Sequence, residues 1–285
     1  MSRLPRSSFF LRLKQGSALV AVIWALVFFA VLSVGITRVV SSQAMLLQRV
    51  EGWVLGEAAM RSACWQIRKE IQIRKEPYFS WADLMRDRDI ELGVSHVRYH
   101  FIDEESRLDI NMASQEQLAQ IPGIGSDLAE KITASPLRPF FAKESLLWID
   151  GFDTAAFEQS KDFVTVYSGG RVNINTAPVV VLQALGFEAS LAADIDRIRK
   201  GPDGVAGTDD DKFFKDSVSV DAMMGSGLSM TDQEKAFMIG LFNAGDLGVD
   251  SDNFTVKASV DVLGKKVMDY DIVLNANKVV RWQEY

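Results

Sequence analysis

An uncharged apolar run near the start of the chain limits what this protein can fold into more than any other feature. The run covers residues 17–35 and lies within LRLKQGSALVAVIWALVFFAVLSVGITR, residues 11–38. A helix of about 20 consecutive apolar residues is long enough to cross a bilayer. The run therefore predicts a membrane-spanning helix.

Basic residues on one side of the run predict its orientation. Arg3, Arg6, Arg12 and Lys14 precede it without any Asp or Glu. The positive-inside rule then keeps residues 1–16 in the cytoplasm and places the rest of the chain outside it. A secretory signal peptide would have a shorter apolar core followed by a small-residue cleavage site. The helical pattern continues instead, which favours a single-pass anchor.

The helical pattern extends well beyond the membrane. Apolar residues recur at alternating steps of three and four, interrupted only by Glu57, which is the spacing of one helix face. They include Val50, Trp53, Met60, Cys64, Ile67 and Ile71. One helix is therefore predicted over residues 17–75, about 90 Å long at 1.5 Å per residue. Half of it would lie in lipid and half against a globular domain.

Strand patterns near both ends of the remaining chain predict one antiparallel sheet. The stretch 93–111 predicts a strand followed by a turn. Three further strands are predicted at 254–262, 266–275 and 279–284. His96 and His100 would share one face of the first strand. No third ligand lies nearby in the sequence, so ordinary sheet histidines are expected there rather than a metal site.

Between these strands, residues 107–244 predict a mainly helical insertion that contains a repeat. LDINMASQEQLAQIPGIGSDLAEKI (108–132) and VNINTAPVVVLQALGFEASLAADI (172–195) match at an offset of 64. Each copy predicts a turn, a helix, a tight loop and a second helix. The matched pairs are Ile110/Ile174, Asn111/Asn175, Ala113/Ala177, Leu118/Leu182 and Ala129/Ala193.

Local signals support this helical interpretation. Ser114 and Gln117 have the spacing of a capping box. Pro178 suits the first turn of a helix. Three glycines, Gly123, Gly125 and Gly186, permit sharp turns between the helices.

The pentapeptide IPGIG, residues 121–125, resembles the helix-hairpin-helix motif, whose glycine amides approach a DNA phosphate. Residues 107–170 carry five Lys or Arg and nine Asp or Glu, and the whole chain has a net charge of -7. That charge repels a phosphate backbone, so no nucleic acid is expected as a partner. The alternative is a membrane-anchored periplasmic receptor that binds DNA, like the competence DNA receptor, although that family lacks such a leader.

The leader and first helix resemble those of type IV pilins and type II secretion pseudopilins. In these families a prepilin peptidase removes a short basic leader directly after a glycine, which implies cleavage between Gly16 and Ser17. Most pilins carry a glutamate at the fifth mature position, where this chain has Ala21. In family models that glutamate neutralises the terminal amine of the subunit already above it. Its absence suits a subunit at the tip of a filament, because an unpaired carboxylate in lipid is costly.

The Gly16 leader, Ala21, FIDEESRLDIN, IPGIG and RVNINTAPVVVLQAL together closely resemble the K-type minor pseudopilin of bacterial type II secretion systems (general secretion pathway protein K). The resemblance implies a tip subunit of the pseudopilus that supports its assembly and protein secretion across the outer membrane. The implied partners are the I-type and J-type minor pseudopilins, the prepilin peptidase and inner-membrane secretion components. The implied location is the bacterial inner membrane, with a single pass and a periplasmic C-terminal domain.

The same resemblance implies an α+β fold in which a pilin-like long N-terminal helix packs on an antiparallel sheet. A large helical insertion would contain the duplicated helix-hairpin-helix-like unit. The expected parts are a cleaved leader at 1–16, the helix at 17–75, the sheet domain at 76–106 and 245–285, and the insertion at 107–244.

No enzymatic activity is expected. The family has none of its own, and the sequence contains no GxSxG motif, no Cys/His pair and no phosphate-binding glycine loop. The single cysteine, Cys64, also excludes an internal disulfide.

A crowded acidic loop predicts a calcium site. Four aspartates, Asp203, Asp209, Asp210 and Asp211, lie in the glycine-rich stretch GPDGVAGTDDDKFF, residues 201–214. Carboxylate oxygens on a flexible loop suit Ca²⁺, which takes six to eight oxygen ligands. K-type pseudopilins have calcium sites in this part of the fold, which strengthens the expectation. A weaker acidic pair, Asp250 and Asp252, either completes this site or forms another.

Overall fold

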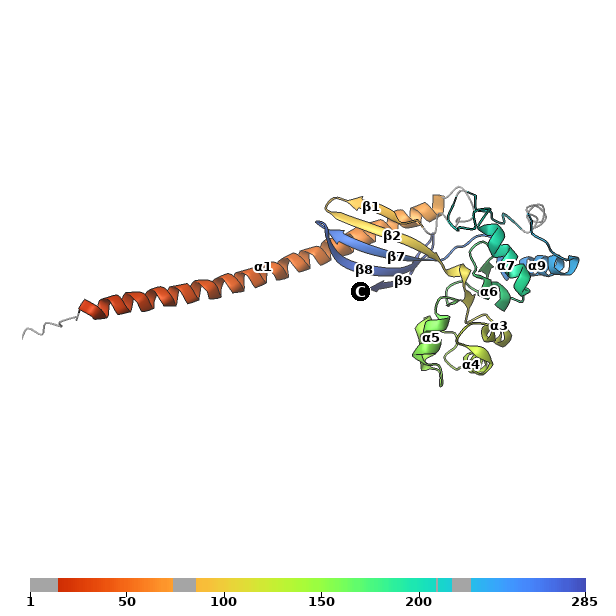
Figure 1. The fold of residues 1–285 in the computed structure, drawn as a ribbon, viewed down its shortest axis with the longest axis horizontal. Coiled ribbons are helices and arrows are strands. Elements are labelled where there is room, and N and C mark those ends of the chain that lie inside the picture. The colour runs from red at the N-terminus through yellow and green to blue at the C-terminus, as the bar shows by residue number, and fades with distance from the viewer. Residues whose placement is uncertain (1–14, 74–85, 209, 217–226) are drawn as a thin grey trace, which may run out of the picture. The chain divides into compact units, whose positions relative to one another are not determined.

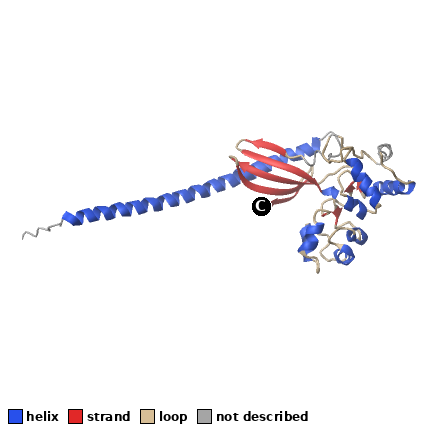
Figure 2. Ribbon diagram, viewed as in Figure 1, coloured by secondary structure: helices blue, strands red, loops and turns tan. Residues whose placement is uncertain are grey.

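The computed structural model describes residues 15–73, 86–208, 210–216 and 227–285 (Figures 1 and 2). The chain divides into two compact units, Met1–Val54 and Leu55–Tyr285. Helix α1 (Gln15–Ile73) provides all described residues of the first unit and the first residues of the second. The long helix predicted from the apolar pattern is confirmed, and it starts two residues before the predicted cleavage point.

Five antiparallel strands form the main sheet of the second unit, in the order β1-β2-β7-β8-β9. Strands from opposite ends of the chain therefore lie side by side, as predicted; for example, Val97 of β2 pairs with Val260 of β7. The edge strand β1 was not predicted. The strands are β1 (Arg88–Leu92), β2 (Ser95–Asp103), β7 (Phe254–Val262), β8 (Lys265–Leu274) and β9 (Val279–Glu284).

The sheet domain has its own core between α1 and one face of the sheet. Met60 and Ile67 of α1 are fully buried in the same cluster as Val97 and Val260. Side chains of a strand alternate between its two faces, so β2 and β7 each bury every second residue against the helix. This packing accounts for the apolar spacing that continues along α1 beyond the membrane-length run.

The insertion is built from two similar copies, each closed by a short parallel strand pair. In the first copy β3 pairs with β4, and in the second β5 pairs with β6. After the short helix η1 (Glu104–Ser106), the first copy contains β3 (Leu108–Asp109), α3 (Gln115–Ala119), α4 (Gly125–Thr133), η2 (Lys143–Trp148), α5 (Thr154–Ser160) and β4 (Val164–Thr165). The second contains β5 (Val172–Asn173), α6 (Val179–Ala184), α7 (Ala189–Arg199), α9 (Asp232–Ala244) and β6 (Leu247–Gly248).

In both copies an asparagine side chain forms two hydrogen bonds with the backbone of a phenylalanine. Asn111 donates to the carbonyl of Phe140 at 2.9 Å and accepts from its N–H at 2.7 Å. Asn175 makes the same two bonds to Phe214, at 2.8 and 2.7 Å. The two asparagines are 64 positions apart and the two phenylalanines 74, so the second copy has ten extra residues before its phenylalanine. The acidic loop lies within this longer segment.

The predicted capping box is present, but two other local predictions are off by one residue. Ser114 forms the capping box with Gln117. Pro178, predicted in the first turn of a helix, is instead the N-cap residue just before α6. Ala129 is fully buried, whereas its predicted match Ala193 is exposed. The buried equivalent is Ala192, because the hairpin before α7 is one residue shorter than the hairpin before α4. Both copies nevertheless share one continuous core.

Candidate functional site

The described part of the first unit presents an exposed, largely apolar surface. Every described side chain from Ala18 to Val50 is exposed, and no charged residue occurs between Lys14 and Arg38. Within the described residues, one helix is long and apolar enough to cross a membrane. Its membrane-length window has no buried residue. Apolar side chains exposed over this length are stable in lipid rather than in water.

The predicted processing residues lie at the start of α1. Gly16 and Ser17 fall within its first turn, so the helix continues across the expected cleavage point. Ala21 lies one turn further on, inside the exposed apolar segment. A carboxylate at position 21 would therefore be surrounded by apolar side chains of its own helix.

Carboxylates of the acidic loop cap the loop's own backbone. Asp203 accepts from the N–H of Val205 at 2.7 Å, and Asp211 accepts from the N–H of Gly207 at 2.8 Å. Asp210 accepts from the N–H of Asp203 at 3.1 Å and from the hydroxyl of Thr208 at 2.6 Å. The hydrogen bonds from the Thr208 hydroxyl and from the N–H of Asp203 hold the pKa of Asp210 below its usual range. The three aspartates are thus ordered around one turn of chain.

One oxygen of this loop has no hydrogen-bond partner in the described part of the chain. Asp211 Oδ1 is buried and makes no hydrogen bond with the described residues. A buried carboxylate oxygen without a donor is costly and suits a cation. Asp209, the fourth predicted ligand, lies outside the described residues. Among the described ones, no group of three or more His, Cys, Asp or Glu side chains has the arrangement of a metal site.

The second acidic pair lies beside an arginine. Arg171 Nη1 is 3.4 Å from Asp250 Oδ1, and its Nη2 is 3.5 Å from Asp252 Oδ2. The same guanidinium binds the buried Glu105, whose Oε2 lies 2.8 Å from Nη2. Arg171 therefore already offsets part of the negative charge of this pair.

A buried carboxylate at the end of β2 connects the second copy to the sheet through hydrogen bonds. Asp103 Oδ2 accepts from Asn173 at 3.1 Å, from Thr176 at 2.5 Å and from Ser251 at 2.7 Å. Its other oxygen accepts from the N–H of Glu105 at 2.8 Å. Asp103 is 3% exposed, so water does not compete for these bonds. The network joins segments up to 148 residues apart. The stretch FIDEESRLDIN contains Asp103 and carries part of the family resemblance, but no role for Asp103 was predicted from it.

Burial dominates the electrostatics of this junction. It raises the pKa of Asp103, Glu105 and Asp109 above their ordinary values, against the effect of the hydrogen bonds that each accepts. Three carboxyl groups near the base of the insertion therefore hold a proton more readily in the folded chain than in the unfolded one.

The IPGIG hairpin packs against protein rather than presenting all of its glycines. Gly123 has a φ of +81°, and a Cβ there would lie 2.6 Å from the carbonyl oxygen of Ala156 in α5. Gly125, at φ +65°, faces open space. Close helix packing thus explains the first glycine without any nucleic acid.

The two strand histidines share one face of β2, as predicted. His96 Nε2 lies 3.0 Å from Asp89 Oδ1, and His100 Nδ1 lies 3.6 Å from Asp87 Oδ1. Both histidines thus contact an aspartate in β1 or just before it. This is consistent with histidines that have a structural role in the sheet.

Comparisons with known proteins agree with this architecture. A family model described as a helix-hairpin-helix motif matches residues 103–165, which include the first copy of the insertion. No curated protein matches the chain significantly. Among solved structures, the chain matches one chain of the GspK-GspI-GspJ complex from the type 2 secretion system of enterotoxigenic Escherichia coli. This chain has the pilin-like fold found in that complex.

The match covers 86% of this chain and 98% of the other, with a TM-score of 0.56 and 17% sequence identity. It therefore includes both the sheet domain and the insertion. The predicted α+β fold, in which a long N-terminal helix accompanies an antiparallel sheet and a helical insertion, is confirmed.

Proposed function

We propose that this protein is a K-type minor pseudopilin of a bacterial type II secretion system. One observation carries the proposal: the fold match extends over nearly the full length of a subunit from the GspK-GspI-GspJ complex. The match includes the helical insertion as well as the sheet domain, so it extends well beyond a shared N-terminal helix. The role is structural rather than catalytic, and the partners are I-type and J-type minor pseudopilins.

Features of α1 support a position at the filament tip. The exposed apolar segment provides a single-pass anchor in the inner membrane, with the rest of the chain in the periplasm. Ala21 offers no carboxylate to the terminal amine of a subunit above it. A tip subunit has no such neighbour and loses nothing by this substitution. There it supports pseudopilus assembly and secretion across the outer membrane.

Maturation by a prepilin peptidase completes this assignment. The enzyme would cut between Gly16 and Ser17 and leave the apolar helix intact. Glycine is needed there because a larger side chain would block access to the backbone.

Calcium binding by the acidic loop is part of the proposal. The buried Oδ1 of Asp211, which makes no hydrogen bond with the described residues, is the observation that favours a cation. Asp203, Asp209 and Asp210 would supply the other carboxylates, while Asp250 and Asp252 remain with Arg171. The ion would stabilise the loop by neutralising charges that otherwise repel one another.

The function is tested by isolating the membrane-extracted protein from cells that express its secretion system and an active prepilin peptidase. We expect the I-type and J-type subunits to co-purify with it, and residues 1–16 to be absent by mass spectrometry. Gly16→Leu should retain the leader. Gly35→Leu, in the same helix, should be processed normally, because a Cβ at that position would meet no atom within 4 Å. An uncleaved wild-type chain that purifies without those subunits would contradict the proposal.

A further inference from the structure

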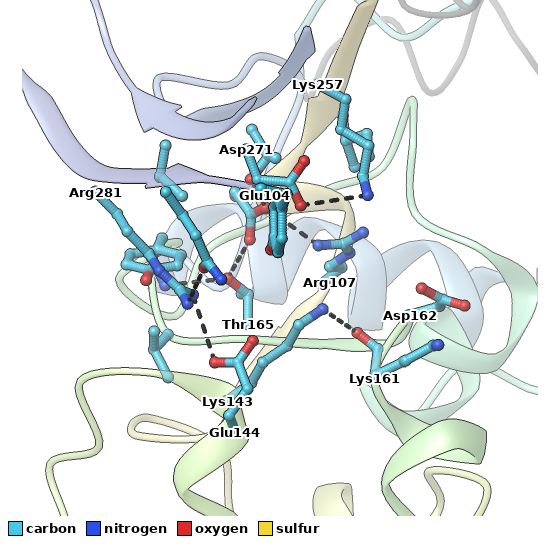
Figure 3. Close-up of a pocket in the computed structure, with 17 residues that line it drawn as sticks. Glu104, Arg107, Lys143, Glu144, Lys161, Asp162, Thr165, Lys257, Asp271 and Arg281 are labelled. Carbon is cyan, nitrogen blue, oxygen red and sulfur yellow. Dashed lines mark hydrogen bonds and ion pairs between the residues drawn. The ribbon is translucent and has the colours of Figure 1, made fainter. Parts of the chain in front are cut away.

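A cavity of about 340 Å³ lies where the first copy of the insertion meets the main sheet. Its walls come from η1 and the residue after it, η2, β4, the segment after α5, and strands β7, β8 and β9 (Figure 3). Pockets that hold small ligands start at about 300 Å³. The cavity is therefore large enough for a small organic or inorganic ion.

Five basic side chains of the described residues line this cavity, and four of them are paired with carboxylates. The ion pairs are Arg107–Glu104, Lys161–Glu158, Lys257–Asp271 and Arg281–Glu144. Lys143 is the fifth, and it makes no ion pair with the described residues. Its Nζ donates to the backbone carbonyl of Lys161 at 2.7 Å. Glu144 and Asp162 also line the cavity and, with Glu104, attract the Lys143 charge through space. Lys143 is thus the lining lysine or arginine of the described residues that has no direct carboxylate contact.

The buried carboxylate of the cavity wall, Glu104, already has partners. Glu104 Oε1 lies 3.1 Å from Arg107 Nη1 and also accepts from the hydroxyl of Thr255. Its Oε2 accepts from the hydroxyl of Thr165 at 2.5 Å. The side chains of Glu104 and Arg107 are 4% and 11% exposed, so this pair is shielded from water. Glu104 thus makes direct contacts with Arg107 and the two threonines, and it acts on Lys143 only through space.

Lys143 and Arg107 present like charges to the same space. Figure 3 shows the two side chains entering the cavity from different walls. Burial lowers the pKa of Lys143 and repulsion from Arg107 lowers it further, against the opposing attraction of Glu104, Glu144 and Asp162. A negative charge placed between them would offset both penalties. Arg107 has further N–H donors besides the Nη1 that binds Glu104.

We propose that this cavity binds a small oxyanion, through a carboxylate or phosphate group held between Lys143 and Arg107. Arginine and lysine together provide the charge-assisted donors that such groups prefer. The proposal concerns the sheet-insertion junction and is independent of the assembly role and of the calcium loop.

The first test is thermal unfolding of the full chain in detergent, in a buffer free of divalent cations. Succinate and inorganic phosphate are titrated separately, with sodium chloride at matched ionic strength as the control. We expect at least one of the two anions to raise the melting temperature in a saturable manner. Lys143→Met should weaken anion binding at least tenfold. Lys257→Met is the control: it removes a lysine of the same cavity that is already ion-paired, and anion binding should persist.

The outcomes are distinct. A shift with succinate alone identifies a carboxylate ligand, and a shift with phosphate identifies a tetrahedral oxyanion. Equal shifts in chloride, or a shift that survives in Lys143→Met, would overturn the proposal.

A second test uses the wild-type chain and does not depend on a variant that folds. A lysine with a lowered pKa has more neutral amine available and reacts faster with an acylating reagent. We expect succinate or phosphate to slow acylation of Lys143, measured by mass spectrometry, while that of Lys257 is unchanged. Equal protection of both lysines, or protection of neither, would count against the site.

Discussion

The two helix-hairpin-helix copies keep the same scaffold but differ in what is attached to it. Both hold a phenylalanine backbone with an asparagine side chain, and both bury equivalent residues such as Ile110 and Ile174. The second copy adds ten residues before Phe214, and the acidic loop lies in this longer segment. The comparison shows that the shared hydrogen bonds preserve the scaffold while the added loop is free to acquire new chemistry.

A second difference decides which copy is fastened to the sheet through Asp103. Asp109 of the first copy accepts from the N–H groups of Asn111 and Gly169, at 2.8 and 2.9 Å. Asn173, 64 positions later, also accepts from an N–H group, but its Nδ2 donates to Asp103 of the sheet domain. Exchange of a carboxylate for an amide thus converts an internal contact into a contact between the insertion and the sheet.

The largest expected effect comes from removing the shared asparagine. Asn175 is 3% exposed, so Asn175→Ala would leave the N–H and C=O of Phe214 buried without partners. Each such group costs about 1–3 kcal/mol, and we expect a loss of about 3 kcal/mol in the free energy of unfolding. Asn111→Ala should cost about half as much, because Asn111 is only half-buried and water can replace it. Equal losses in chemical denaturation would show that burial does not distinguish the copies.

The proposed calcium binding by the acidic loop can be tested as a property that only the second copy has. A ligand that binds only the folded state at one hundred times its dissociation constant adds about 2.7 kcal/mol of stability. We expect millimolar calcium to raise the melting temperature, magnesium to do so less, and the double variant Asp209→Ala, Asp211→Ala to abolish the shift. Ser114→Ala in the first copy is a control that should lower stability without changing the calcium response. Identical melting in calcium and chelator would leave the aspartates as backbone caps only.

Alanine variants of the two hairpin glycines test whether IPGIG is needed for close packing against α5. Gly123→Ala would place a methyl group 2.6 Å from the backbone oxygen of Ala156, which cannot move without shifting α5. Gly125→Ala has the same left-handed strain but meets open space. We expect Gly123→Ala to lower the free energy of unfolding by about 2 kcal/mol more than Gly125→Ala, the typical cost of overpacking. If both cost the same, the tight contact with α5 is not important for stability.

The smallest expected effect is a change in the pH dependence of stability when Asp109 of the first copy is replaced by asparagine, the residue at the matching position of the second copy. Burial raises the folded-state pKa of Asp109 above its unfolded value of about 3.9. Its stabilising contribution is therefore fully present below the unfolded pKa and is lost as pH rises through the folded pKa. Asp109→Asn cannot bind that proton. The wild-type chain should exceed the variant in unfolding free energy by more at about pH 4 than at about pH 7, and a constant difference would refute this.

The sequence by itself determined the elements whose signals are local. The uncharged apolar run specified α1, and the alternating patterns at 254–262 and 279–284 predicted strands with those bounds. The capping box at Ser114 and the offset of 64 specified the two copies. These signals are readable because periodicity, caps and glycine turns act between residues close together in the chain.

The tertiary structure alone decided how these pieces are joined. Asp103 lies in FIDEESRLDIN, but no role for this residue was predicted from the sequence. It is a centre of the junction between insertion and sheet because the fold brings Ser251 and Thr176 to it. The register shift from Ala193 to Ala192 and the cavity around Lys143 were equally hidden. The physical reason is that burial, pKa shifts and side-chain hydrogen bonds depend on distances between residues far apart in the chain. Those distances are set only when the whole domain packs.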